Sequence, residues 1–205
     1  MKSMGTPSDV SVGRARKTAF AECMSVLKAA SMDDPFTNWL STSERVRERY
    51  LRYVLMSGFR TGWVSLGRPR GGVCVATPIR TTADPCLFWG WLRFRLAISE
   101  VQWRALQQVS AVVWEHSEEA GAMIWYVGIV RRFRGGRLPF RLVSRALPDQ
   151  ESTSVLIQTV RPSLARLVAR EGGEELAQIS LPTEPLTMRL YRLDDRQVQR
   201  LRRGL

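Results

Sequence analysis

The chain has 205 residues, of which 44% are hydrophobic and 24% are charged, and its formal net charge is +12. This balance is typical of a folded domain with a real core, and it excludes a largely disordered chain. No apolar run reaches the 18 or more residues of a membrane span, so we expect no membrane association.

In chain order, the polar segment 1–15 predicts a flexible lead-in, and residues 16–205 predict one domain. The lead-in lacks the apolar core of a signal peptide, so we expect a cytoplasmic protein. A first helix is predicted over 16–31 because its apolar residues recur at helical spacing. A second begins at Glu44, after N-cap residues, and is expected to end before Gly58.

The rest of the pattern alternates strands and helices, although the aromatic segment 88–94 has no clear periodicity. Two strongly apolar runs, 122–130 and 155–160, predict buried central strands. This order is typical of a mixed α/β domain. The further elements predicted are a hairpin of 63–66 and 73–76, helices 99–116, 140–146, 163–170 and 195–203, and strands 176–179 and 187–193.

The charge comes almost entirely from arginine, since 31 basic residues include only three lysines. One interpretation is a polyanionic partner, which could be a phosphate-bearing cofactor, an acidic acyl carrier protein or tRNA. The other is a solvated basic surface produced by arginine-rich coding. The three cysteines lack metal-ligand spacing and predict buried free thiols.

Three segments resemble the GNAT superfamily of N-acetyltransferase-like proteins. They are the turn Asp33-Asp34-Pro35 after the first helix, the strand and loop from Trp125 to Pro139, and the strand from Val155 to Thr159 with its following helix. The order of elements is similar to that family along roughly the whole chain. The resemblance implies a GNAT fold, with a twisted, mostly antiparallel central sheet, two splayed central strands and flanking helices.

The resemblance also implies a cofactor, acetyl-CoA or another acyl-CoA. In the family a Gly-rich turn opens a helix whose backbone N–H groups bind the pyrophosphate, where the helix dipole favours an anion. Here Arg137 replaces a glycine and Pro139 removes a donor, although arginine side chains could rebuild the anion site. The alternative is a plain surface turn. The expected cofactor-binding residues are Ile129, Val130, Arg131, Arg134, Gly135, Gly136 and Arg137.

The family's proton-donating tyrosine corresponds here to Val168, which has no proton to give. The catalytic candidates are therefore His116, the sole histidine, and Tyr126, which lies in the central strand. The alternative interpretations are that His116 is an exposed residue at a helix end and that Tyr126 belongs to the core. Backbone N–H groups near Ile129 and Val130 are expected to polarise the thioester carbonyl.

We therefore expect an acyltransferase that uses an acyl thioester and a small-molecule acceptor, in biosynthesis or specialised metabolism. Two alternatives stay open. One is another reaction on the same fold, such as cyclisation or decarboxylation, and the other is a non-catalytic binding protein. Of the tryptophans in the middle third, a subset could form the wall of an apolar substrate cavity. These are Trp89, Trp91, Trp103, Trp114 and Trp125.

Overall fold

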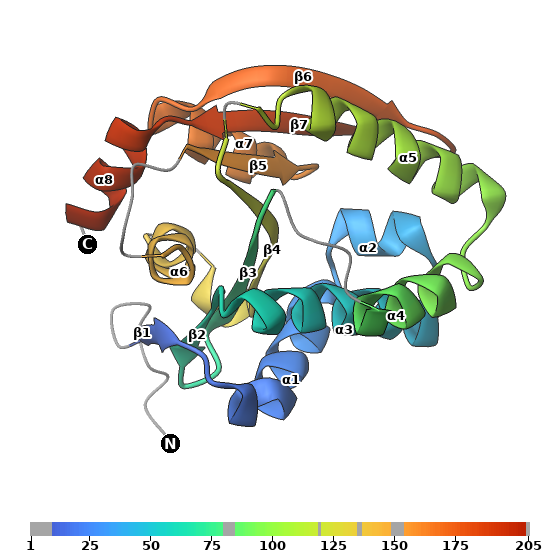
Figure 1. The fold of residues 1–205 in the computed structure, drawn as a ribbon, viewed down its shortest axis with the longest axis horizontal. Helices are drawn as coiled ribbons and strands as arrows, with labels where there is room; N and C mark the ends of the chain where they lie inside the picture. Colours follow the sequence, from blue (N-terminus) through green and yellow to red (C-terminus); the bar gives the residue numbers. More distant parts are fainter. Residues whose placement is uncertain (1–9, 80–84, 119, 135–136, 149–153, 204–205) are drawn as a thin grey trace.

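The computed structural model describes residues 10–79, 85–118, 120–134, 137–148 and 154–203, which form a 7-stranded sheet between two groups of helices (Figure 1). The strand order is β1-β2-β3-β4-β5-β7-β6. Neighbouring strands are antiparallel except for the parallel pair β4 and β5, which confirms the expected mixed, mostly antiparallel sheet. The strands are β1 Ser11–Arg14, β2 Val64–Arg68, β3 Gly72–Pro78, β4 Ala122–Ile129, β5 Val155–Thr159, β6 Glu174–Leu181 and β7 Leu186–Leu193.

The helices fall into two groups because alternate residues of each strand point to opposite faces of the sheet. One buried cluster joins the sheet to the N-terminal helices, and a second joins its other face to the C-terminal helices. On the first face lie α1 Phe20–Ser31, α2 Pro35–Leu40, α3 Glu44–Thr61, α4 Pro85–Arg95 and α5 Glu100–Glu115. On the second lie α6 Leu138–Ala146, α7 Pro162–Arg170 and α8 Asp195–Arg203.

A β-bulge in β4 opens the middle of the sheet. Val75 of β3 faces Tyr126 and the next residue, Ala76, faces Ile124, so Trp125 is an extra residue on β4. The parallel ladder between β4 and β5 ends at the same level, with the pair Ile124 and Ile157. Beyond it β4 stays with β3 while β5 stays with β7, and the two halves of the sheet diverge (Figure 1). The predicted splayed pair is thereby confirmed.

The end of α3 differs from the prediction. The helix continues through Gly58 and stops at Gly62, which has φ 77° and provides the left-handed C-cap. Gly58 serves packing instead, because a Cβ there would lie 2.5 Å from a methyl carbon of Val75 and 2.8 Å from one of Val64. The contact comes from strands β2 and β3, which no local pattern in the helix reveals.

Three further elements were not predicted. Residues 11–14 lie in the segment expected to be a flexible lead-in, but they form the edge strand β1, paired with β2. Helix α2 begins directly after the Asp34 N-cap, and α4 covers the whole aromatic segment 88–94, which has no clear periodicity.

Candidate functional site

Three cavities meet where β4 and β5 diverge. The cleft cavity, about 520 Å³, lies on the α6 and α7 side, and the aromatic cavity, about 670 Å³, lies on the α3, α4 and α5 side. A small neck of about 70 Å³ lies between the two strands. The cleft cavity is lined by Ala30, Asp34, Tyr126, Val127, Gly128, Ile129, Arg134, Arg137, Pro139, Phe140, Arg161, Ser163, Leu164, Leu167, Arg170 and Glu171.

The neck shares walls with both larger cavities. Asp34, Tyr126 and Arg161 line the cleft cavity and the neck, while Trp125 and Gln158 line the neck and the aromatic cavity. The bulge explains this arrangement, since it places the consecutive residues Trp125 and Tyr126 against the same buried cluster. The neck therefore lies between the two large cavities and shares lining residues with each.

Asp34 is the buried carboxylate of the neck, with 8% of its surface exposed. It is the N-cap of α2, where Oδ2 accepts a hydrogen bond from the backbone N–H of Thr37 at 3.0 Å. Its other oxygen, Oδ1, accepts from Arg161 Nε at 3.2 Å. Pro35, at the first position of the helix, has no backbone N–H that needs a hydrogen-bond acceptor, and it favours a helix start at this point. The local sequence Asp-Pro therefore places the Asp34 carboxylate at the N-cap.

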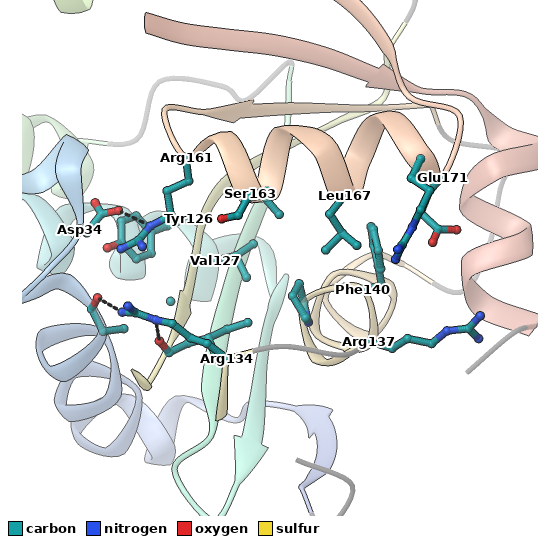
Figure 2. A pocket seen from close by; sticks show the side chains of 16 residues that line it. Asp34, Tyr126, Val127, Arg134, Arg137, Phe140, Arg161, Ser163, Leu167 and Glu171 are labelled. Carbon is teal, nitrogen blue, oxygen red and sulfur yellow. Dashed lines mark hydrogen bonds and ion pairs between the residues drawn. The ribbon is translucent and has the colours of Figure 1, made fainter. Parts of the chain in front are cut away.

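Asp33, next to it, forms an ion pair across the cleft cavity's edge. Its carboxylate binds two nitrogens of Arg134, and this contact holds the pKa of Asp33 below its ordinary value and raises that of Arg134. Arg134 also donates from Nε to the Ile129 carbonyl at 3.1 Å (Figure 2). Arg134 lines the cleft cavity, and all three of its side-chain nitrogens donate to groups of the protein, so its predicted contact with an anion stays a prediction.

Tyr126 lies beside Asp34 and Arg161 at the inner end of the cleft cavity, as Figure 2 shows. Burial raises the pKa of its hydroxyl well above the ordinary value, and the negative charge of Asp34 adds to the effect. The hydroxyl therefore keeps its proton at neutral pH, and it is the position of Tyr126 at the neck that makes it a candidate proton donor.

The aromatic cavity confirms that a subset of tryptophans forms the wall of an apolar cavity. Trp91, Trp103, Trp114 and Trp125 line it, while Trp89 is 62% exposed and does not. The rings of Trp91 and Trp103 meet edge to face at 5.4 Å, an arrangement that fixes the wall. None of the described residues that line this cavity is charged.

The predicted catalytic histidine lies elsewhere. His116 is the C-cap of α5 and lines none of the three cavities described above. The assignment of a role to it stays a prediction.

The predicted cofactor residues are divided by the structure. Ile129 and Arg137 line the cleft cavity, whereas Arg131 is exposed outside it, in the short turn after β4. The Val130 N–H donates to the Gly71 carbonyl at 3.1 Å, which removes it as the expected donor to a thioester. The predicted residues Gly135 and Gly136 lie outside the described part of the chain.

Val168 does not face the cavity at all. It is 1% exposed and packs in the cluster formed by α6, α7 and α8. The residues of α7 that line the cavity are instead Ser163, Leu164, Leu167 and Arg170. The mismatch follows from helix geometry, because neighbouring positions on a helix point about 100° apart.

Sequence reasoning missed Asp34, Arg161, Ser163 and Gln158 as site residues. Asp34 had a signal in the Asp-Pro turn, which was interpreted only as the end of the first helix and as part of the resemblance to the GNAT superfamily. Gln158 lies on β5 and Arg161 directly precedes α7, and nothing in the sequence marks either as a site residue. Both reach the neck because β4 diverges from β5.

Comparison with known proteins identifies the fold. No family model and no curated protein sequence matches the chain. A polyamine N-acetyltransferase of Drosophila melanogaster, which forms N-acetylagmatine, superposes with a TM-score of 0.66 at 16% identity, covering 91% of this chain and 100% of that one.

Two further solved structures are similar. An arylalkylamine N-acetyltransferase-like protein, 5b, from mosquito has a TM-score of 0.63 at 15% identity, covering 91% and 100% of the two chains. The C-terminal condensation domain of Ebony, bound to β-alanyl-dopamine, has a TM-score of 0.61 at 7% identity, covering 91% and 99%. At such identities the likeness shows the fold, so the chain has the fold of the GNAT acetyltransferases.

No helix among the described residues has the length and apolarity to cross a membrane, and no group of three or more His, Cys, Asp or Glu side chains in that part of the chain could hold a metal ion.

Proposed function

We propose that this protein transfers an acyl group from a thioester, acetyl-CoA or another acyl-CoA, to the amine of a small molecule. The observation that carries the proposal is the neck between β4 and β5, which joins a basic cavity to an aromatic one. Such a passage suits a reaction between two substrates that enter from opposite faces of the sheet. Two of the similar structures are N-acetyltransferases.

The cleft cavity fits the acyl donor in part. Val127, Leu164 and Leu167 offer an apolar wall for the donor's thiol-bearing arm, and the arginines Arg137 and Arg170 lie near the start of α6. Pro139 lacks an N–H, so phosphate binding would depend on arginine side chains more than on the helix backbone. The thioester would supply an activated acyl group.

The residues of the neck would manage the protons. Asp34 would accept the proton that an acceptor amine loses as it forms the new amide bond. Tyr126, which keeps its proton, would donate to the departing sulfur. Arg161 would hold the Asp34 carboxylate in position through its 3.2 Å hydrogen bond.

The test combines donor binding with product formation. The purified protein is titrated with CoA by calorimetry, then incubated with acetyl-CoA and a panel of primary amines, with mass spectrometry to detect the acylated product. Ser163 projects into the cleft cavity, so Ser163→Trp should weaken CoA binding by at least about tenfold (Figure 2).

Ala169→Trp is the matched control, because Ala169 is exposed on the same helix and does not line the cavity. It should bind CoA as the unchanged protein does. CoA binding without any product would favour a non-catalytic binding protein, and no CoA affinity would contradict the proposed donor.

A further inference from the structure

A smaller cavity continues from the cleft cavity toward the last helix. This side cavity has a volume of about 260 Å³ and lies between the start of α6, the end of α7 and α8. Arg200 of α8 lines the side cavity but not the cleft cavity. A ligand in the cleft cavity can therefore extend past the end of α7 to α8. The residues that line both cavities are Arg137, Phe140, Arg170 and Glu171.

Positive charge predominates in the side cavity. Arg137, Arg170 and Arg200 line it, and Glu171 is the one acid among the lining residues that the structure describes. Neither Arg170 nor Arg200 forms a hydrogen bond or an ion pair with any residue of the described ranges. Like charges around one cavity repel each other, so an anion between them is stabilised. A phosphate monoester carries about −1.5 to −2 charges at pH 7, which matches the excess of two positive charges.

The distance between the side cavity and the neck fits a long ligand. Helix α7 runs along the cleft cavity, with Arg161 at its start beside the neck and Glu171 after its far end (Figure 2). The 9 residues of this helix span about 14 Å. A ligand that reacts at the neck and reaches the side cavity must therefore carry its anionic group at the end of an extended arm. CoA has this form, since its thiol and its phosphates stand at opposite ends of the molecule.

We propose that the side cavity binds the phosphate on the ribose of CoA, so that the protein selects a free CoA thioester over dephospho-CoA and over an acyl arm attached to a carrier protein. The inference rests on the proposed function, which places the donor in the cleft cavity. Arg137 and Arg170, which line both cavities, lie beside the diphosphate, and the guanidinium fork of Arg200 binds the ribose phosphate. The arm on a carrier protein has no ribose phosphate and would leave Arg200 without a ligand.

Calorimetry compares CoA with dephospho-CoA, because the two probes differ only in the ribose phosphate. At low salt CoA should bind at least about tenfold more tightly, and a higher ionic strength should reduce this difference because the arginines of the side cavity are exposed. Arg200→Gln should weaken CoA binding by about fivefold or more and leave dephospho-CoA binding unchanged. Such a pattern measures the coupling between this side chain and the ribose phosphate.

Arg203→Gln is the matched control, since Arg203 is an exposed arginine of the same helix that does not line the side cavity. It removes the same charge and should change CoA affinity by less than about twofold. Equal affinity for the two probes, or equal losses in Arg200→Gln and Arg203→Gln, overturns the inference.

The proposed function and this inference fail in different ways. A preference for CoA without acyl transfer to any amine would contradict only the proposed function. Acyl transfer that uses acetyl-CoA and acetyl-dephospho-CoA equally well would contradict only this inference. Binding of neither probe would contradict both.

Discussion

Replacing Asp34 by Asn separates the charge of this side chain from its role at the helix end. Asn is as good an N-cap as Asp, so its oxygen can still accept from the Thr37 N–H and α2 should persist. What is lost is the charge at the neck and the ion pair with Arg161. If Asp34 accepts the acceptor's proton, kcat/KM should fall by about 10²- to 10⁴-fold.

The stability cost should be small by comparison. The side chains of the pair are 12% and 30% exposed, between a surface pair worth up to about 1 kcal/mol and a buried pair whose disruption costs about 3–5 kcal/mol. Arg161 also keeps its hydrogen bond to the Asp33 carbonyl at 3.1 Å. We expect a loss of about 1–2 kcal/mol, hence a Tm lower by about 2–8 °C for a chain of this size.

The assay is steady-state amide formation, with thermal unfolding of the same samples. Asp33→Asn is the control, because Asp33 is a neighbouring carboxylate that lines none of the three cavities, and the variant should retain most of the activity. Asp34→Ala should lose about 1 kcal/mol more than Asp34→Asn, since the cap is gone as well. An Asp34→Asn protein that folds and keeps its full rate would refute the assignment of Asp34 as the base.

Four further outcomes are expected. Val168→Tyr should lower the free energy of unfolding by about 1–3 kcal/mol or more through overpacking, whereas Leu167→Tyr, facing the cavity, should be tolerated in thermal unfolding. His116→Ala should leave kcat unchanged, and a large loss would restore the histidine as a catalytic candidate. Gly58→Val should lower the Tm, because its side chain would enter those of β2 and β3. Because the pKa of Tyr126 is raised in the folded protein, this group contributes stability that is present below about pH 10, the ordinary pKa of tyrosine, and is lost as the pH rises above it. Between about pH 9 and 11 the Tm of Tyr126→Phe should therefore fall less than the Tm of the unchanged protein.

Much of the fold could be predicted because its elements have local signatures. The strong apolar runs became β4 and β5 to within a residue at either end, and α5 begins and ends one residue inside the predicted range 99–116. The edge strand β1 has no comparable signal, since three of its four residues are exposed and pairing with β2 holds it in place. Helix α2 is only 6 residues long, too short for periodicity to reveal.

The site was less predictable than the fold. Tyr126 was found because it lies in a central strand, but its neighbours Asp34 and Arg161 are 127 positions apart in the sequence. The resemblance placed Val168 at the cavity, and only packing shows that its side chain points into the core instead. Residue roles at a cleft depend on which face each side chain takes, and that is decided by contacts between distant segments.

The bulge at Trp125 has a consequence for how such a protein can change over time. The opening between the strands depends on one additional residue in β4, so it is specified by a residue count and not by the chemistry of particular side chains. Deleting Trp125 would make Ile124 and Tyr126 consecutive, still opposite Ala76 and Val75, and would remove the bulge on which the opening depends. Substitutions leave the count unchanged. A cleft encoded in this way can survive the replacement of most of its walls, and it leaves the aromatic cavity free to diverge.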